Sequence, residues 1–206
     1  MTARPLRPLL PLAVVAAIVA GCGSSSKAKP AAESKATTFE GGVANPPRPA
    51  FPLKLRDSTG KAFDLASYRG KAVLISFQYV HCPDECPLMT ANLHTALKQL
   101  GSLASRVQVV AVSTDPKGDR PKAVNAYLAK HQVTGEMRYL IGSKAELARV
   151  WKTWGIVSKP DPSAPGKVGH SALTYGISAS GKITTLYPSN FGAAGIAHDA
   201  RILVKQ

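Results

Sequence analysis

Cysteine, acidic residues and long apolar runs are all scarce in this chain of 206 residues. Three cysteines are too few for a site built from four thiolates, which excludes a closed zinc site of the four-cysteine kind. The apolar run from Leu9 to Ala20 holds about 12 residues, whereas a membrane-spanning helix needs about 20, so it is not a transmembrane span. The sequence also has no internal repeats.

The shortage of acidic residues leaves the chain strongly basic, because 26 Lys and Arg face 12 Asp and Glu and give a formal net charge of +14. Basic proteins often bind nucleic acid, but here the Lys and Arg are dispersed rather than clustered with aromatic residues. We therefore predict no nucleic-acid partner. A solvated surface facing an anionic cell envelope explains the charge better, and an acidic protein partner stays open without a motif that supports it.

The N-terminal residues have the pattern of an export signal. Arg4 and Arg7 supply a basic start, the short apolar run follows, and small residues then lead to Cys22. The ending "VAGC" resembles the bacterial lipobox, which implies cleavage before Cys22 and a lipid on its sulfur. An ordinary secretory signal with an incidental cysteine is the alternative. We expect a lipoprotein signal peptide over 1–21 and a lipid-anchored protein on the extracytoplasmic face of a bacterial membrane.

Composition divides the remainder into a tether and a domain. Residues 22–49 are mostly Ser, Lys, Ala, Pro and Gly with hardly any large apolar side chain, which predicts a lipidated, flexible tether. Residues 50–206 have the length of one ordinary domain. Hydrophobic residues make up 45% of the chain, enough for a core.

The order of the expected elements indicates an α/β fold. Alternation predicts an N-terminal β-hairpin over 51–65, and unbroken apolar runs predict buried strands over 71–80 and 106–112. Helical periodicity and capping residues predict four helices, one that ends at Gly101 and others over 119–130, 143–154 and 193–204. Further strands are predicted at 137–141, 172–177 and 182–186, and a mobile loop over 155–169. This order predicts a thioredoxin-like fold, with a central mixed sheet flanked by helices.

The segment "YVHCPDECP" holds the other two cysteines, Cys82 and Cys86. Proline disfavours the helical conformation in the residue before it, so neither cysteine is expected inside a helix. We expect a turn from Cys82 to Glu85, with Cys86 near the N-cap and Pro87 at the first helical position. Both sulfurs would then lie at a helix N-terminus and at the carboxyl end of a central strand, where thiolates are favoured and ligands often bind.

Several kinds of chemistry use a close cysteine pair. A structural zinc would need two more ligands, and the nearest downstream histidine, His94, lies on the helix surface by its spacing. Cu(I) is a softer ion that three ligands can hold, and it favours thiolate with imidazole. A redox-active thiol pair and a disulfide Cys82–Cys86 that merely closes a turn stay open at this point.

Five histidines could supply an imidazole. His94 faces away from the leucine face of its helix, His131 ends a predicted helix, and His198 lies far along the last helix. His81 adjoins Cys82, but neighbouring residues of an extended segment point to opposite sides. His170 ends the expected mobile loop just before a strand, where it could move over the sulfurs.

Three motifs resemble those of the Sco/SenC family: "FQYVHCPDECP" (77–87), "VSTDPKGDRP" (112–121) and "GHSALTYGISASGKI" (169–183). The resemblance spans residues 51–206. It implies a thioredoxin-like protein that supplies copper to the binuclear copper site of cytochrome c oxidase. It also implies that Cys82, Cys86 and His170 bind one copper ion per domain, as Cu(I) or Cu(II), and that the partner is the copper-site subunit or another copper acceptor. Asp115 matches an acidic position near the family's site.

Two other functions suit the same residues. A thiol–disulfide oxidoreductase would reduce the cysteines of the oxidase copper site, or act in extracytoplasmic redox homeostasis, with Cys82 and Cys86 as the exchanging pair and no required part for His170. A peroxiredoxin-like peroxidase would need an arginine over the reactive thiol, and the sequence does not indicate which arginine that is.

Overall fold

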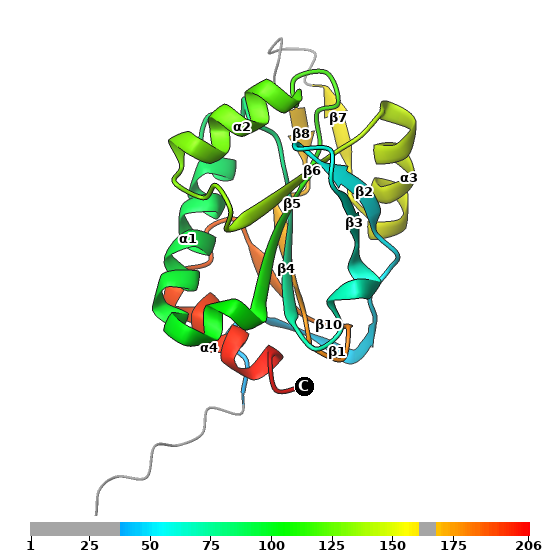
Figure 1. The fold of residues 1–206 in the computed structure, drawn as a ribbon. Helices are drawn as coiled ribbons and strands as arrows, with labels where there is room; N and C mark the ends of the chain where they lie inside the picture. The colour runs from blue at the N-terminus through cyan, green and yellow to red at the C-terminus, as the bar shows by residue number, and fades with distance from the viewer. Residues whose placement is uncertain (1–37, 161–167) are drawn as a thin grey trace, which may run out of the picture. The chain divides into compact units, whose positions relative to one another are not determined.

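The computed structural model describes residues 38–160 and 168–206 (Figure 1). The expected signal peptide at 1–21, Cys22 and the first part of the expected tether lie outside the described residues. Within the described ranges, no helix combines the length and the hydropathy that crossing a membrane requires.

The described strands form one eight-stranded sheet and a separate two-stranded ribbon. The order in the large sheet is β1-β10-β9-β4-β5-β6-β2-β3. Strands β4, β5 and β6 pair in parallel, and the other neighbours pair antiparallel. The strand bounds are β1 Gly42–Pro49, β2 Lys54–Asp57, β3 Ala62–Asp64, β4 Ala72–Gln78, β5 Val107–Ser113, β6 Met137–Ile141, β9 Leu173–Ile177 and β10 Lys182–Pro188, with β7 Ser158–Pro160 and β8 Val168–His170 in the ribbon.

Helices cover both faces of the sheet (Figure 1). Helices α1, α2 and α4 lie on one face and α3 lies on the other; the β2–β3 hairpin forms the edge of the sheet and contributes side chains to the core on the α3 side. Their bounds are α1 Glu85–Leu100, α2 Pro121–Lys130, α3 Lys144–Trp154 and α4 Ala193–Leu203, with short 3₁₀ helices at Leu65–Tyr68 and Gly101–Arg106. The capping box predicted at Ser143 and Glu146 is present at the start of α3.

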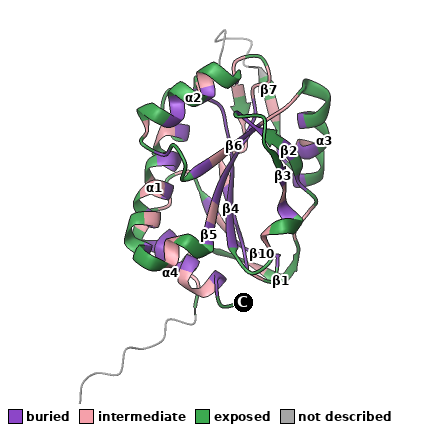
Figure 2. Cartoon of the chain, in the orientation of Figure 1, coloured by how far each residue is buried: buried purple, intermediate pink, exposed green. Residues whose placement is uncertain are grey.

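Strand β4 is the centre of the core, and all seven of its residues are buried (Figure 2). Successive side chains point to opposite faces, so Leu74 packs beneath α1 and α4 whereas Ile75 packs on the side of α3. Burial of each such side chain contributes roughly 1.5–3 kcal/mol, as an upper bound. The carboxyl end of β4, where the cysteine segment begins, is therefore anchored from both faces.

The prediction that residues 42–49 belong to a flexible tether is wrong, because they form β1 and pair with β10. Asp199, fully buried on α4, also accepts hydrogen bonds from the backbone N–H groups of Glu40 and Gly41, each at 2.9 Å. Pairing uses backbone groups and a distant carboxylate, so the polar composition of this segment did not reveal it. The ordered domain begins ahead of residue 42.

Candidate metal centre

The cysteine segment leaves β4 through a tight turn. The N–H of Cys82 donates to the carbonyl of Tyr79 at 3.2 Å, which places the turn three residues earlier than the predicted turn from Cys82 to Glu85. Asp119 fixes this turn, since its carboxylate accepts the N–H of Val80 at 2.9 Å. The backbone at Cys82 is therefore fixed by two hydrogen bonds, its own to Tyr79 and that of Val80 to the buried carboxylate of Asp119.

Helix α1 begins earlier than predicted, so that Cys86 lies inside its first turn. Asp84 is the N-cap, and Pro87 occupies the third helical position instead of the first. Proline is tolerated there because the N–H groups of the first turn have no partner within the helix, and the first helical bond runs from Leu88 N–H to Asp84 O at 3.2 Å. Cys86 N–H instead donates to the Cys82 sulfur at 3.3 Å.

His170 is held on a strand. It ends β8, whose register pairs His170 with Ser158 of β7, so the ends of the predicted mobile loop form an antiparallel ribbon. Ser158 Oγ donates to the carbonyl of Thr114 at 2.8 Å, which attaches this ribbon to the end of β5. Val168 N–H donates to the hydroxyl of Tyr79 at 3.3 Å, which attaches it to the end of β4. The prediction of an irregular loop over 155–169 is therefore wrong at the described ends, which pair as strands.

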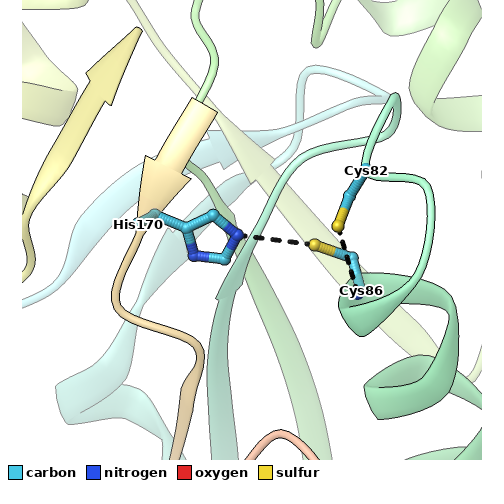
Figure 3. A group of neighbouring side chains, drawn as sticks. All are labelled: Cys82, Cys86 and His170. Atoms are coloured by element: carbon cyan, nitrogen blue, oxygen red, sulfur yellow. Dashed lines mark hydrogen bonds between the residues drawn. The ribbon is translucent and has the colours of Figure 1, made fainter. Parts of the chain in front are cut away.

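The structure brings Cys82, Cys86 and His170 together (Figure 3). The two Sγ atoms and one ring nitrogen all lie within 4.8 Å of one another, and Cys86 Sγ is 3.6 Å from His170 Nε2. Both cysteines are free thiols and both are buried, Cys86 completely. Residues 84 positions apart in the sequence thus converge at the carboxyl end of β4.

The two thiols differ in proton affinity. A hydrogen bond from the Cys86 thiol, helped by His170 and by backbone N–H groups of Cys86 and Asp84, outweighs burial and lowers the pKa of Cys82 to about 4. Donation to the Cys82 thiolate, together with burial, raises the pKa of Cys86 well above its ordinary value. At neutral pH the pair therefore holds one thiolate and one thiol.

This donor set fits a soft metal ion. Ligand bonds of about 2.0–2.3 Å, as thiolate and imidazole make to zinc, place the ligand atoms of a three-coordinate ion roughly 3.5–4 Å apart. The observed 3.6 Å between Cys86 Sγ and His170 Nε2 matches that spacing. Two sulfurs and one imidazole favour Cu(I) over harder ions, and the N-terminus of α1 favours their negative charge.

Sequence reasoning missed two residues that organise the site. Tyr79, 3% exposed, packs its ring against His170. Asp119, also 3% exposed, accepts from Val80 N–H and from the hydroxyl of Tyr139 at 3.1 Å. Burial, opposed by these bonds and by Ser113, raises the pKa of Asp119 to about 6. Asp115, which the family pattern indicated, accepts the N–H of Lys117 at 3.0 Å.

The other four histidines have separate environments. His94 Nδ1 lies 2.6 Å from Glu136, and His198 Nδ1 lies 2.9 Å from Asp199. The ring of His131 packs on Tyr127 with centroids 4.3 Å apart, and His81 is exposed. Among the described residues, the cluster that could hold a metal contains His170 and none of these four.

Comparisons with known proteins agree with this geometry. The family model SCO1/SenC matches residues 45–205. The SCO1 protein homolog of Bacillus subtilis is 27% identical over 140 residues, which cover 66% of this chain and 72% of that protein. The mitochondrial SCO2 homolog of Bos taurus is 28% identical over 154 residues, which cover 72% of this chain and 57% of that protein.

Solved structures show the same fold. The structure of Bradyrhizobium japonicum ScoI with copper bound matches with a TM-score of 0.67 at 29% identity, over 76% of this chain and 99% of that chain. Together with the mixed sheet and its flanking helices, this likeness confirms the predicted thioredoxin-like fold.

Proposed function

Because the chain belongs to the SCO1/SenC family, we propose that it binds copper and delivers it to the binuclear copper site of cytochrome c oxidase during assembly of that enzyme. One ion binds per domain, held by Cys82, Cys86 and His170. The observation that carries this proposal is the convergence of three soft or borderline ligand atoms within 4.8 Å. The copper-bound state of the related Bradyrhizobium protein supports copper as the cargo.

Release of the ion follows from the same site. Three ligands leave a coordination position for a ligand from an acceptor, so copper can pass by exchange of one ligand at a time. The protein in this proposal stands on the extracytoplasmic face of a bacterial membrane, anchored through lipid on Cys22. The part of the expected tether ahead of β1 would let the domain reach its acceptor.

Anaerobic titration of the reduced protein with Cu(I) tests the proposal. Wild type should bind one equivalent, and His170→Ala should weaken binding by at least about tenfold in competition with a Cu(I) chelator, because one ligand is lost. His131→Ala is the matched control, since that histidine lies outside the cluster, and it should bind like wild type. Full stoichiometric binding by the Cys82→Ser/Cys86→Ser double variant would refute the proposal.

A thiol–disulfide oxidoreductase is the second candidate, and the unequal proton affinities of the two thiols favour it. The Cys82 thiolate can attack a disulfide of the substrate, and the Cys86 thiol, once deprotonated, can resolve the mixed disulfide. The substrate is then reduced and Cys82–Cys86 becomes a disulfide. Oxidase assembly that survives His170→Ala but fails with either cysteine variant would favour this function over copper delivery.

A further inference from the structure

A cavity of about 940 Å³ adjoins the candidate metal centre at the carboxyl edge of β5 and β6. Its walls come from the β2–β3 hairpin, the β5–α2 connection, the start of α3 and the β7–β8 ribbon. Two residues of its wall are connected to the segments that carry the metal ligands. Val168, on its wall, lies two residues before His170, and Asp119, also on its wall, holds the backbone two residues before Cys82.

The cationic groups of the cavity are not neutralised by the fold. Lys117 and Lys144 are exposed, and neither has a carboxylate oxygen of the described residues within 4.0 Å. The two arginines on the rim donate to backbone carbonyls: Arg56 to Gly60 at 2.8 Å and Arg120 to Lys117 at 3.1 Å. Four positive charges therefore face one cavity.

The four acidic residues of the cavity each accept hydrogen bonds from the protein itself. Glu146 accepts from the backbone N–H and hydroxyl of Ser143 at 2.8 and 2.6 Å. Asp57 accepts from the guanidinium of Arg138 at 2.6 Å. Asp115 and Asp119 accept backbone N–H groups, as described above. These bonds do not cancel the carboxylate charges, but Asp57 and Asp119 are buried and Asp57 is paired with Arg138. At the rim, four exposed cations therefore face the two accessible carboxylates of Asp115 and Glu146, which leaves the rim net positive.

The N-terminus of α2 adds to the positive potential. Arg120 is its N-cap, and its first turn contains no acidic residue, whereas the first turn of α3 holds Glu146. A cation at the start of α2 opposes the helix dipole, and an anionic occupant would relieve that repulsion.

The interior of the cavity also indicates an occupant. Thr114 lines it and is 1% exposed, yet its hydroxyl has no hydrogen-bond partner within the described part of the chain. Buried hydroxyl groups rarely lack a partner. The remaining lining is largely apolar, with Ile141, Trp151 and Val168. The occupant that fits has carboxylates for the rim and an apolar side chain for the interior.

We propose that this cavity is the docking site for an acidic peptide segment of a partner protein. Its volume is near the upper end of ligand-site volumes and far exceeds that of a phosphate or a small dicarboxylate, so such an anion bound at the rim would leave the apolar interior unfilled. The role of that partner as copper donor or acceptor rests on the proposed function. A segment seated there lies beside β8, and so presents its own metal ligands next to His170.

Fluorescence polarisation tests this with a labelled, capped octapeptide in which a Leu-Phe pair is flanked on each side by three Glu residues. We expect saturable binding to the metal-free protein, weakened by salt, with quenching of Trp151, while Trp154 is 2% exposed and stays unaffected. Lys117→Glu/Lys144→Glu should weaken binding by at least about tenfold. Lys182→Glu/Lys205→Glu makes the same change in net charge at exposed positions outside the cavity, and should have little effect.

Each other result would overturn the docking site. The docking site is excluded if wild type does not bind the peptide, or if both charge-reversal pairs weaken binding equally. It is also excluded if a peptide with Gln in place of Glu binds equally well. Complete displacement of the peptide by millimolar phosphate or succinate would indicate a small-anion site in its place. The Cys82→Ser/Cys86→Ser variant separates the two proposals. Peptide binding by this variant supports the docking site even if copper delivery fails, whereas a wild-type protein that binds one copper but no peptide overturns the docking site alone.

Discussion

Tyr79 and His170 meet edge to face, with ring centroids 5.5 Å apart and ring planes at 87°. The Tyr79 hydroxyl also accepts the N–H of Val168. Tyr79 follows β4, which leads to the thiols, whereas His170 ends β8. One side chain therefore connects the segment that carries the sulfurs to the strand that carries the imidazole.

Replacing Tyr79 by Phe should loosen this connection without opening a cavity. The lost hydrogen bond to Val168 should cost about 0.5–1.5 kcal/mol of unfolding free energy, measured by urea denaturation. Copper should dissociate several-fold faster into a chelator, because His170 is held less firmly. Tyr68→Phe is the control. The Tyr68 hydroxyl also accepts one hydrogen bond, from Arg138 at 3.1 Å, and the Tyr68 ring packs on Phe63, outside the metal cluster. Equal copper release by the two variants would contradict a positioning role for Tyr79.

The low pKa of Cys82 predicts how stability depends on pH in the reduced, metal-free protein. In the unfolded chain this thiol ionises near pH 8.5, whereas in the folded protein it ionises near pH 4. Unfolding therefore takes up a proton between these values, so this group makes the folded state more stable as pH rises. Its contribution is lost as pH falls toward 4. Thermal melts should show the rise between pH 6 and 8.5 in wild type, and a flatter profile in Cys82→Ser.

Asp119 should have the opposite effect at lower pH. Its folded pKa of about 6 lies above its ordinary value near 3.8, so the folded state holds an extra proton between them. Stability from this group is present below pH 3.8 and is lost as pH rises through 6. Asp119→Asn keeps an acceptor for the N–H of Val80 but cannot ionise. Its melting temperature should therefore exceed that of wild type at pH 8 by more than at pH 5, and a constant difference would exclude this origin.

Asp199 should determine where the ordered domain begins. Asp199→Ala leaves the N–H groups of Glu40 and Gly41 without their acceptor, which should cost about 1–3 kcal/mol of unfolding free energy. It should also release β1, so that brief proteolysis cleaves within 38–49 faster than in wild type. His198→Ala removes one further contact of Asp199 but keeps both backbone bonds, and should protect this segment as wild type does. Unchanged cleavage in Asp199→Ala would show that pairing with β10 alone holds the segment.

Much of the fold could be predicted because the signals were local. The unbroken apolar run of β4, the leucine spacing of α1 and the capping box of α3 each specify an element within a few residues. The start of α1 was misplaced because proline is compatible with any position in the first helical turn, and the bond between Cys86 N–H and the Cys82 sulfur selects one of them. Strands β1, β7 and β8 were missed because their partners lie elsewhere in the chain, and their own composition is that of a loop.

The sequence by itself determined the chemistry of this protein: two cysteines before prolines at the end of a buried strand, motifs that identify the family, and a shortage of acidic residues. The motifs already implied that His170 joins the thiols. Only the tertiary structure decided how far apart the three ligand atoms lie, which of the two sulfurs has the lower proton affinity, and that Tyr79 and Asp119 hold the site. The reason is physical. Residue types fix which ligands and charges exist, but proton affinities and ligand distances depend on burial and on hydrogen bonds between segments that only the folded sheet brings together.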